Sequence, residues 1–93
     1  MKQDIVDIEW ELWRDLCTRL EETGLVTKAD LRSSVSENGT KGQSLLHAIR
    51  AYGEDRSNEI ARLTVVRLIN GEEYVLTAVR EWAQARALLP KGY

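Results

Sequence analysis

The chain has 93 residues, 43% of them hydrophobic and 30% charged, and a formal net charge of −2. The length and composition suit one folded domain over residues 1–93 and exclude wholesale disorder. The net charge excludes a general attraction to nucleic acid or acidic membranes. The only cysteine, Cys17, excludes an intrachain disulfide and a zinc site built on thiolates. The amino-terminal sequence lacks the apolar core of a signal peptide, and no apolar run has the length of a membrane span, so we expect a cytoplasmic protein.

Residues 4–23 have the periodicity of an amphipathic helix. Their apolar side chains cover an arc of roughly 200° on a helical wheel, which is more than one neighbouring helix can cover. Either several helices pack on this arc, or part of it binds a partner. Trp10 and Trp13 therefore belong either to the core or to an exposed apolar patch. The arc consists of Ile5, Val6, Ile8, Trp10, Leu12, Trp13, Leu16, Cys17 and Leu20.

A joint between two helices follows. Gly24 is placed to end the first helix in a left-handed cap, since glycine adopts positive φ without steric cost. Thr27 can cap the second helix through its hydroxyl, with Asp30 in the reciprocal position of a capping box. We expect this second helix to be short and to end near Ser34 or Val35, where turn-forming residues begin.

The same capping pattern recurs before a third helix. Thr40 is followed three residues later by Gln43, and an apolar face then continues through Leu45, Leu46, Ala48, Ile49 and Tyr52. Gly53 is expected to close this helix, and Asp55 or Ser57 to cap a fourth.

The stretch around Asn70-Gly71 is ambiguous. Between apolar runs, this dipeptide is a strong signal for a β-hairpin, which here would pair residues 63–69 with residues 72–78. It also fits a helix stop, with Asn70 and Glu73 as a further capping pair. One helical register holds from Glu73 to Leu89, so we predict helices on both sides, the last ending at Pro90.

The predicted fold class is therefore all-α, a compact antiparallel bundle of five to six helices. The sequence shows no clear catalytic signature, and we expect neither an enzyme nor a cofactor or metal site. His47 is the only histidine and is expected to face solvent, while Cys17 is expected to be a small buried hydrophobe. Glu9 lies on the apolar arc. It is either buried with a raised pKa, or at the fraying start of the helix, or paired with an arginine from another helix.

Two segments carry a resemblance to a known family. Residues 24–31 read Gly-Leu-Val-Thr-Lys-Ala-Asp-Leu, and residues 45–53 read Leu-Leu-x-x-Ile-x-x-x-Gly. Over about residues 12–69, this arrangement resembles the caspase-recruitment (CARD) branch of the death-fold superfamily, whose first helix ends in a similar joint. That family has six helices; the last helix predicted here is long enough to be two that have merged.

The resemblance implies an adaptor that binds other death-fold domains, often copies of itself, in signalling assemblies of an immune or defence type. Family contacts oppose an acidic face to a basic one, and the charge distribution independently agrees. Residues 1–24 carry seven acids and three bases, a charge of −4, whereas the remainder carries eight acids and ten bases, a charge of +2. The implied acidic face is Asp7, Glu11, Asp15 and Glu22, and the implied basic face is Lys28, Arg32, Lys41 and Arg50.

We therefore predict a non-enzymatic protein–protein interaction module that recruits a protein partner through these two faces, with no membrane or nucleic-acid partner. One alternative is a winged-helix nucleic-acid binder, with the hairpin at Asn70-Gly71 as its wing. Another is a small inhibitor or immunity protein that binds one target.

Overall fold

Five α-helices and no strand make up the computed structural model over the residues that it describes, 5–89. The all-α prediction is confirmed. The predicted helix start at residue 4 and stop at Pro90 lie outside this range. The helices are α1 (Ile5–Glu22), α2 (Lys28–Arg32), α3 (Lys41–Glu54), α4 (Glu59–Ile69) and α5 (Glu73–Ala87).

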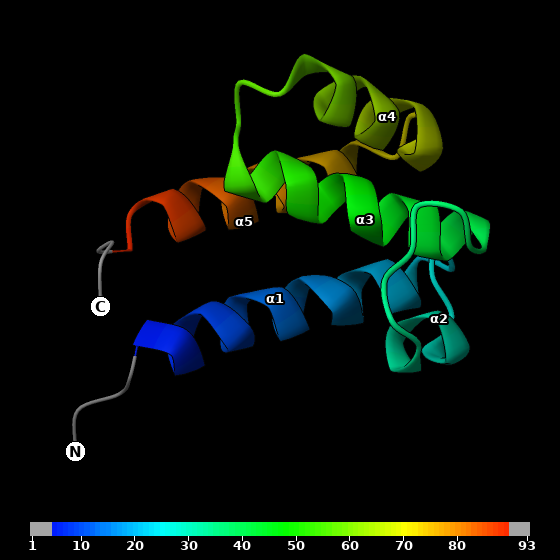
Figure 1. Cartoon of the computed structure of the whole chain (residues 1–93), viewed down its shortest axis with the longest axis horizontal. Helices are drawn as coiled ribbons and strands as arrows, with labels where there is room; N and C mark the ends of the chain where they lie inside the picture. Colours follow the sequence, from blue (N-terminus) through cyan, green and yellow to red (C-terminus); the bar gives the residue numbers. More distant parts are fainter. Residues whose placement is uncertain (1–4, 90–93) are drawn as a thin grey trace.

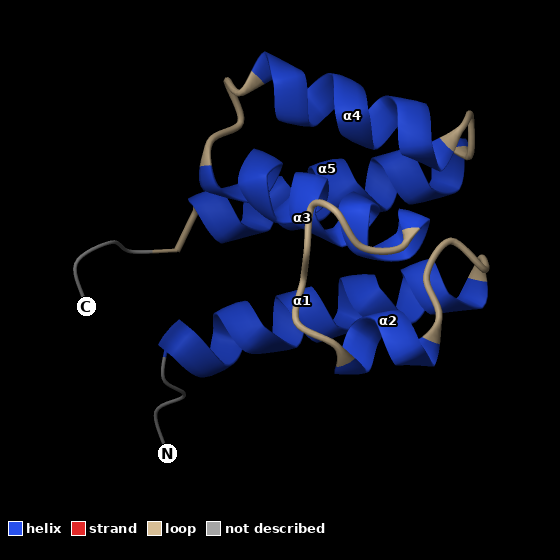
Figure 2. Ribbon diagram, turned by 45° about the vertical axis from the view of Figure 1, so that its right-hand side comes forward, coloured by secondary structure: helices blue, strands red, loops and turns tan. Residues whose placement is uncertain are grey.

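The helices stack in layers (Figure 1). α1 lies along one edge and α4 along the opposite edge, with α3 and α5 between them, and the second view shows the same order (Figure 2). α1 packs against α5, α3 packs against both α4 and α5, and the short α2 packs against the start of α3. None of the described helices is long and apolar enough to cross a membrane.

The joint between α1 and α2 forms as the sequence predicts. Gly24 adopts φ +79°, and its N–H donates to the carbonyl of Glu21 at 3.0 Å, so the left-handed turn satisfies the end of α1. Thr27 and Asp30 form a complete capping box at the start of α2. This helix ends at Arg32, slightly earlier than predicted.

The start of α3 also matches its prediction, but the role expected of Gly53 is wrong. Thr40 and Gln43 form the second complete capping box. Gly53 does not terminate α3; it is a buried residue within the last turn, where an added Cβ would overlap the ring of Trp82. Glycine is needed there because an aromatic side chain packs directly against the backbone.

The predicted caps of α4 and α5 are also wrong. Asn58 caps α4 by accepting a hydrogen bond from the Ala61 N–H at 3.1 Å, whereas the Asp55 side chain accepts from the N–H of Ser57 at 3.0 Å. α5 begins after Glu72, which makes no side-chain cap, so the expected pairing of Asn70 with Glu73 does not form.

The hairpin alternative is wrong, because Asn70 and Gly71 link two helices. Both residues adopt positive φ, 56° and 86°, and the Asn70 N–H donates to the carbonyl of Val66 as a helix stop. A winged-helix protein would need strands on either side of this turn, where the structure has α4 and α5.

The core lies between the layers and is mainly aliphatic. Its largest fully buried side chains come from every helix except α2, so each long helix contributes to the same core. These side chains are Leu20, Leu45, Leu46, Ile49, Ile69, Val75 and Val79.

Candidate functional site

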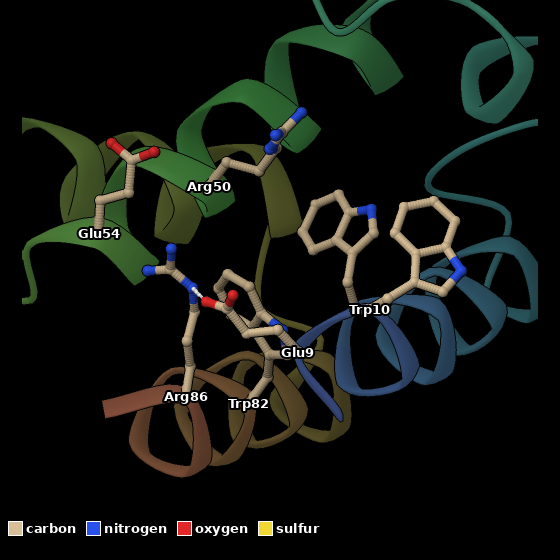
Figure 3. A pocket seen from close by; sticks show the side chains of 7 residues that line it. Glu9, Trp10, Arg50, Glu54, Trp82 and Arg86 are labelled. Atoms are coloured by element: carbon tan, nitrogen blue, oxygen red, sulfur yellow. Dashed lines mark ion pairs between the residues drawn. The ribbon is translucent and has the colours of Figure 1, made fainter. Parts of the chain in front are cut away.

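A pocket of about 250 Å³ lies where α1, α3 and α5 meet, and we call it the tryptophan pocket. Figure 3 shows its side chains converging from the three helices. α5 contributes Trp82 and Arg86, which share one face because they are four residues apart. The pocket is lined by Glu9, Trp10, Trp13, Arg50, Glu54, Trp82 and Arg86.

Aromatic and guanidinium groups that pack together form one wall of this pocket. The rings of Trp13 and Trp82 lie 5.3 Å apart between centroids, at an interplanar angle of 56°. The Arg50 guanidinium lies over the Trp13 ring at 5.7 Å, within cation–π range. Trp82 itself is buried against Gly53, and its indole N–H has no hydrogen-bond partner among the described residues. This wall is therefore held by packing more than by hydrogen bonds.

Arg86, near the carboxyl end of α5, contacts both α1 and α3. Arg86 Nε lies 3.0 Å from Glu9 Oε1, and Arg86 Nη1 donates to the Gly53 carbonyl at 2.5 Å. Both charged side chains are 29% exposed. The expectation that Glu9 pairs with an arginine from another helix is confirmed. Arg86 was not among the predicted site residues, although its spacing from Trp82 places both on one face of the last helix.

The two tryptophans of α1 have different environments. Trp13 is half-buried against the core, whereas Trp10 is 62% exposed. The wide apolar arc of α1 is thus covered at Trp13 and left open at Trp10. A large exposed indole beside a pocket is the type of group that dominates binding energy in protein interfaces.

A second concavity, of about 510 Å³, lies between α3 and α4, and we call it the α3–α4 groove. Lys41 and His47 line it from α3, and Arg67 and Ile60 line it from α4. His47 is exposed, as predicted. Only one carboxylate, Glu37, lines the groove. The groove therefore combines positive charge with apolar surface.

The outer face of α4 is unusually apolar. Ile60, Leu63 and Val66 are 81%, 53% and 36% exposed. The sequence places apolar residues all round this helix, and the fold buries only one side of it, through Ala61, Val65 and Ile69. Exposed apolar side chains at adjacent helical positions mark an interaction surface more often than isolated ones do.

The predicted acidic residues lie together, whereas the predicted basic residues are divided. Every member of the implied acidic face is exposed on α1. Of the implied basic face, Lys28 and Arg32 lie on α2, Lys41 lines the α3–α4 groove, and Arg50 lines the tryptophan pocket. Lys28 also pairs with Glu21 of α1 at 4.0 Å. The four basic residues therefore do not share one pocket.

Cys17 is a buried thiol in the described core. Burial raises the pKa of the Cys17 thiol to about 11, against the opposing attraction of Arg50, so this thiol is neutral at physiological pH. Its burial confirms the sequence prediction. Within residues 5–89, no group of three or more His, Cys, Asp or Glu side chains could hold a metal ion.

Comparisons with protein-family models, with curated proteins and with solved structures find no match to this chain. The structure is a compact all-α domain with five described helices.

Proposed function

We propose that the chain is a non-enzymatic protein–protein interaction module, an adaptor or recruitment domain. The observation that carries this proposal is the exposure of Trp10, 62%, at the edge of the tryptophan pocket. Leaving an indole of this size in water forgoes a stabilising burial of about 1.5–3 kcal/mol or more. A partner protein that covers Trp10 recovers that burial.

Two further features support binding to a protein. The outer face of α4 presents three more exposed apolar side chains, on the side of the molecule opposite α1. The Arg50 guanidinium lies over the Trp13 ring and lines the tryptophan pocket. Arginine and tryptophan together are typical of the residues that contribute most at interfaces.

The finer proposal is a recruitment domain like those of the CARD family, in a signalling or defence assembly. It is supported by the two capping boxes and the left-handed Gly24 joint, which give the α1-to-α3 corner that the resemblance describes. The exposed acidic face of Asp7, Glu11, Asp15 and Glu22 on α1 further supports it.

Site-specific photo-crosslinking tests the proposal. Trp10 is replaced by a photoreactive benzoylphenylalanine in the cells that naturally express the chain, and Thr77, exposed on α5, is replaced in a matched control. We expect discrete crosslinked proteins from position 10 and none from position 77. Identical background from both positions would contradict the proposed function.

A further inference from the structure

We propose that the α3–α4 groove binds an anionic amphiphile, a small molecule with a carboxylate or phosphate head and an alkyl tail. This inference goes beyond the proposed function, because it uses neither Trp10 nor the tryptophan pocket. The volume of the groove, about 510 Å³, lies within the range of roughly 300–1,000 Å³ that is typical of small-molecule sites. The tryptophan pocket, at about 250 Å³, lies below that range.

Two antiparallel helices form the walls of the groove. Residues 55–58 join α3 to α4, and the two helices run in opposite directions (Figure 1, Figure 2). The lining positions 41, 44, 48 and 51 of α3 share one helical face, as do positions 60, 64 and 67 of α4. The first turn of α3 therefore lies beside the last turn of α4, and the groove has two different ends.

One end of the groove is basic. Lys41, in the first turn of α3, and Arg67, in the last turn of α4, line this end, and both are exposed. His47 lines the groove further along α3 and adds an imidazole N–H donor. Glu37 is the only carboxylate among the described lining residues, so basic side chains outnumber acidic ones. Lysine and arginine form strong charge-assisted hydrogen bonds with carboxylate and phosphate groups.

The other end of the groove is mainly apolar. Ala51 of α3 and Ile60 and Ala61 of α4 line it, and Ile60 is 81% exposed. An alkyl tail that covers these side chains would bury apolar surface on both sides of the contact. None of the described residues that line the groove is aromatic, so a nucleobase would find no ring on which to stack. The lining therefore favours an aliphatic ligand over a nucleotide.

Three neutral polar side chains that line the groove are bonded to the backbone. The Ser44 hydroxyl donates to the Glu37 carbonyl at 2.8 Å, and the Thr64 hydroxyl donates to the carbonyl four residues earlier in α4 at 2.7 Å. Asn58 Oδ1 accepts from the Ala61 N–H at 3.1 Å, as the cap of α4. A polar head is therefore bound best at the basic end, and a ligand that is polar throughout fits the groove less well.

NMR titration of the whole chain tests the proposal, with decanoate and decyl phosphate as probes below their micelle-forming concentrations. We expect saturable shifts of the amide signals of Lys41, Ala51, Ile60 and Arg67 with at least one probe. The probe that binds more tightly identifies the preferred head. Acetate and inorganic phosphate lack the tail, and decyl maltoside lacks the charge, so each should bind at least about tenfold more weakly.

Charge removal at the basic end tests the role of the head. Lys41→Gln with Arg67→Gln should weaken binding of the tighter probe at least about tenfold, because the anion loses both of these cationic partners. Arg14→Gln with Arg80→Gln is the matched control, since it removes the same charge from exposed positions outside the groove. This control should leave the affinity unchanged within about twofold.

A second pair of variants tests the role of the tail. Ile60→Ser removes an exposed apolar side chain from the groove and should weaken binding by about threefold or more. Leu63→Ser is the control, because Leu63 is exposed on the same helix but does not line the groove. Far-UV circular dichroism verifies that every variant is folded.

Three results would each overturn the proposal. They are groove signals that neither decyl probe shifts, shifts centred on the tryptophan pocket instead, and control variants that lose as much affinity as the groove variants. The proposed function stands or falls separately, because crosslinking from position 10 reports a protein partner whatever the groove binds.

Discussion

The carboxylate of Asp30 joins the starts of two helices. Its Oδ1 accepts a hydrogen bond from the hydroxyl of Thr40 at 2.5 Å, and its Oδ2 accepts from the N–H of Thr27 at 2.9 Å. Asp30 is the buried polar residue of the described core, and an added Cβ at Gly42 would overlap it. The capping boxes of α2 and α3 are therefore one connected network, which the sequence suggests only as two separate boxes.

Asp30→Asn should lower the free energy of unfolding at pH 7 by about 1–3 kcal/mol, because an amide cannot accept both hydrogen bonds. The hydrogen bonds from Thr40 and Thr27 hold the pKa of Asp30 below its usual value. Their contribution is therefore present above the usual pKa, about 4, and is lost as pH falls through the lower folded pKa.

Urea unfolding at several pH values measures this difference. The wild type and Asp30→Asn should converge in stability as pH falls below about 4. Asp15→Asn, an exposed control, should change stability by less than about 0.5 kcal/mol at pH 7. A constant difference between wild type and Asp30→Asn down to pH 2 would refute the role of the ionised carboxylate.

Gly53 fixes how closely α5 approaches α3. In an unobstructed helix, Gly53→Ala would stabilise the protein by about 0.5–1 kcal/mol. Because the new methyl group would overlap the Trp82 ring, we expect a net loss of about 1–3 kcal/mol instead. Denaturant unfolding of Gly53→Ala, Trp82→Leu and the double variant gives the coupling energy. A stabilised Gly53→Ala variant would show that the helices do not pack in this way.

At the scale of the element, α4 is a helix whose sequence pattern does not specify its buried side. Its apolar residues surround the helix, so periodicity cannot say which side is buried. The fold decides this, since Ile69 is fully buried and Ile60 is 81% exposed. The exposed apolar side chains of α4 therefore follow from its sequence, but no segment within residues 5–89 covers them.

Two identical substitutions on α4 test this assignment. Ile69→Ala should lower the free energy of unfolding by about 2–5 kcal/mol, since it removes buried methyl groups and leaves a cavity. Ile60→Ala should change it by less than about 0.5 kcal/mol. Thermal or chemical denaturation compares them directly, and similar losses at both positions would contradict the orientation of α4.

Element boundaries are predictable from this sequence where one local signal acts alone. The helix stop at Gly24 and the helix caps at Thr27 and Thr40 form as predicted. Asp55 and Gly53 have alternatives: an aspartate can stabilise a turn as well as a cap, and a buried glycine can serve packing instead of termination.

The candidate site was only partly predictable, because it combines helices that are far apart in sequence. Helical periodicity predicts the exposure of the acidic face. It also places Glu9 on the apolar arc, where its carboxylate pairs with an arginine. The separation of Arg50 from Lys28 does not follow from periodicity, because it depends on how the helices pack against one another. Local patterns carry no information about such crossings.

At the scale of the whole molecule, the acidic face of α1 and the groove lined by Lys41 and Arg67 lie at opposite edges. α1 carries the acidic face and Trp10, while the edge formed by α4 carries the α3–α4 groove and Ile60. Such complementarity increases the association rate and orients the partners, and it weakens as salt screens the charges.

Amide chemical shifts across a dilution series measure whether this chain binds copies of itself, as the proposed CARD-like recruitment domain would. On concentration at low salt, we expect signals from two regions to shift together: the acidic face of α1 around Trp10, and the walls of the α3–α4 groove at Lys41 and Arg67. These shifts should decrease in about 1 M salt, and signals from Thr77 on α5 should stay constant. Shifts confined to other surfaces, or a spectrum independent of concentration, would contradict association of this chain through these two surfaces.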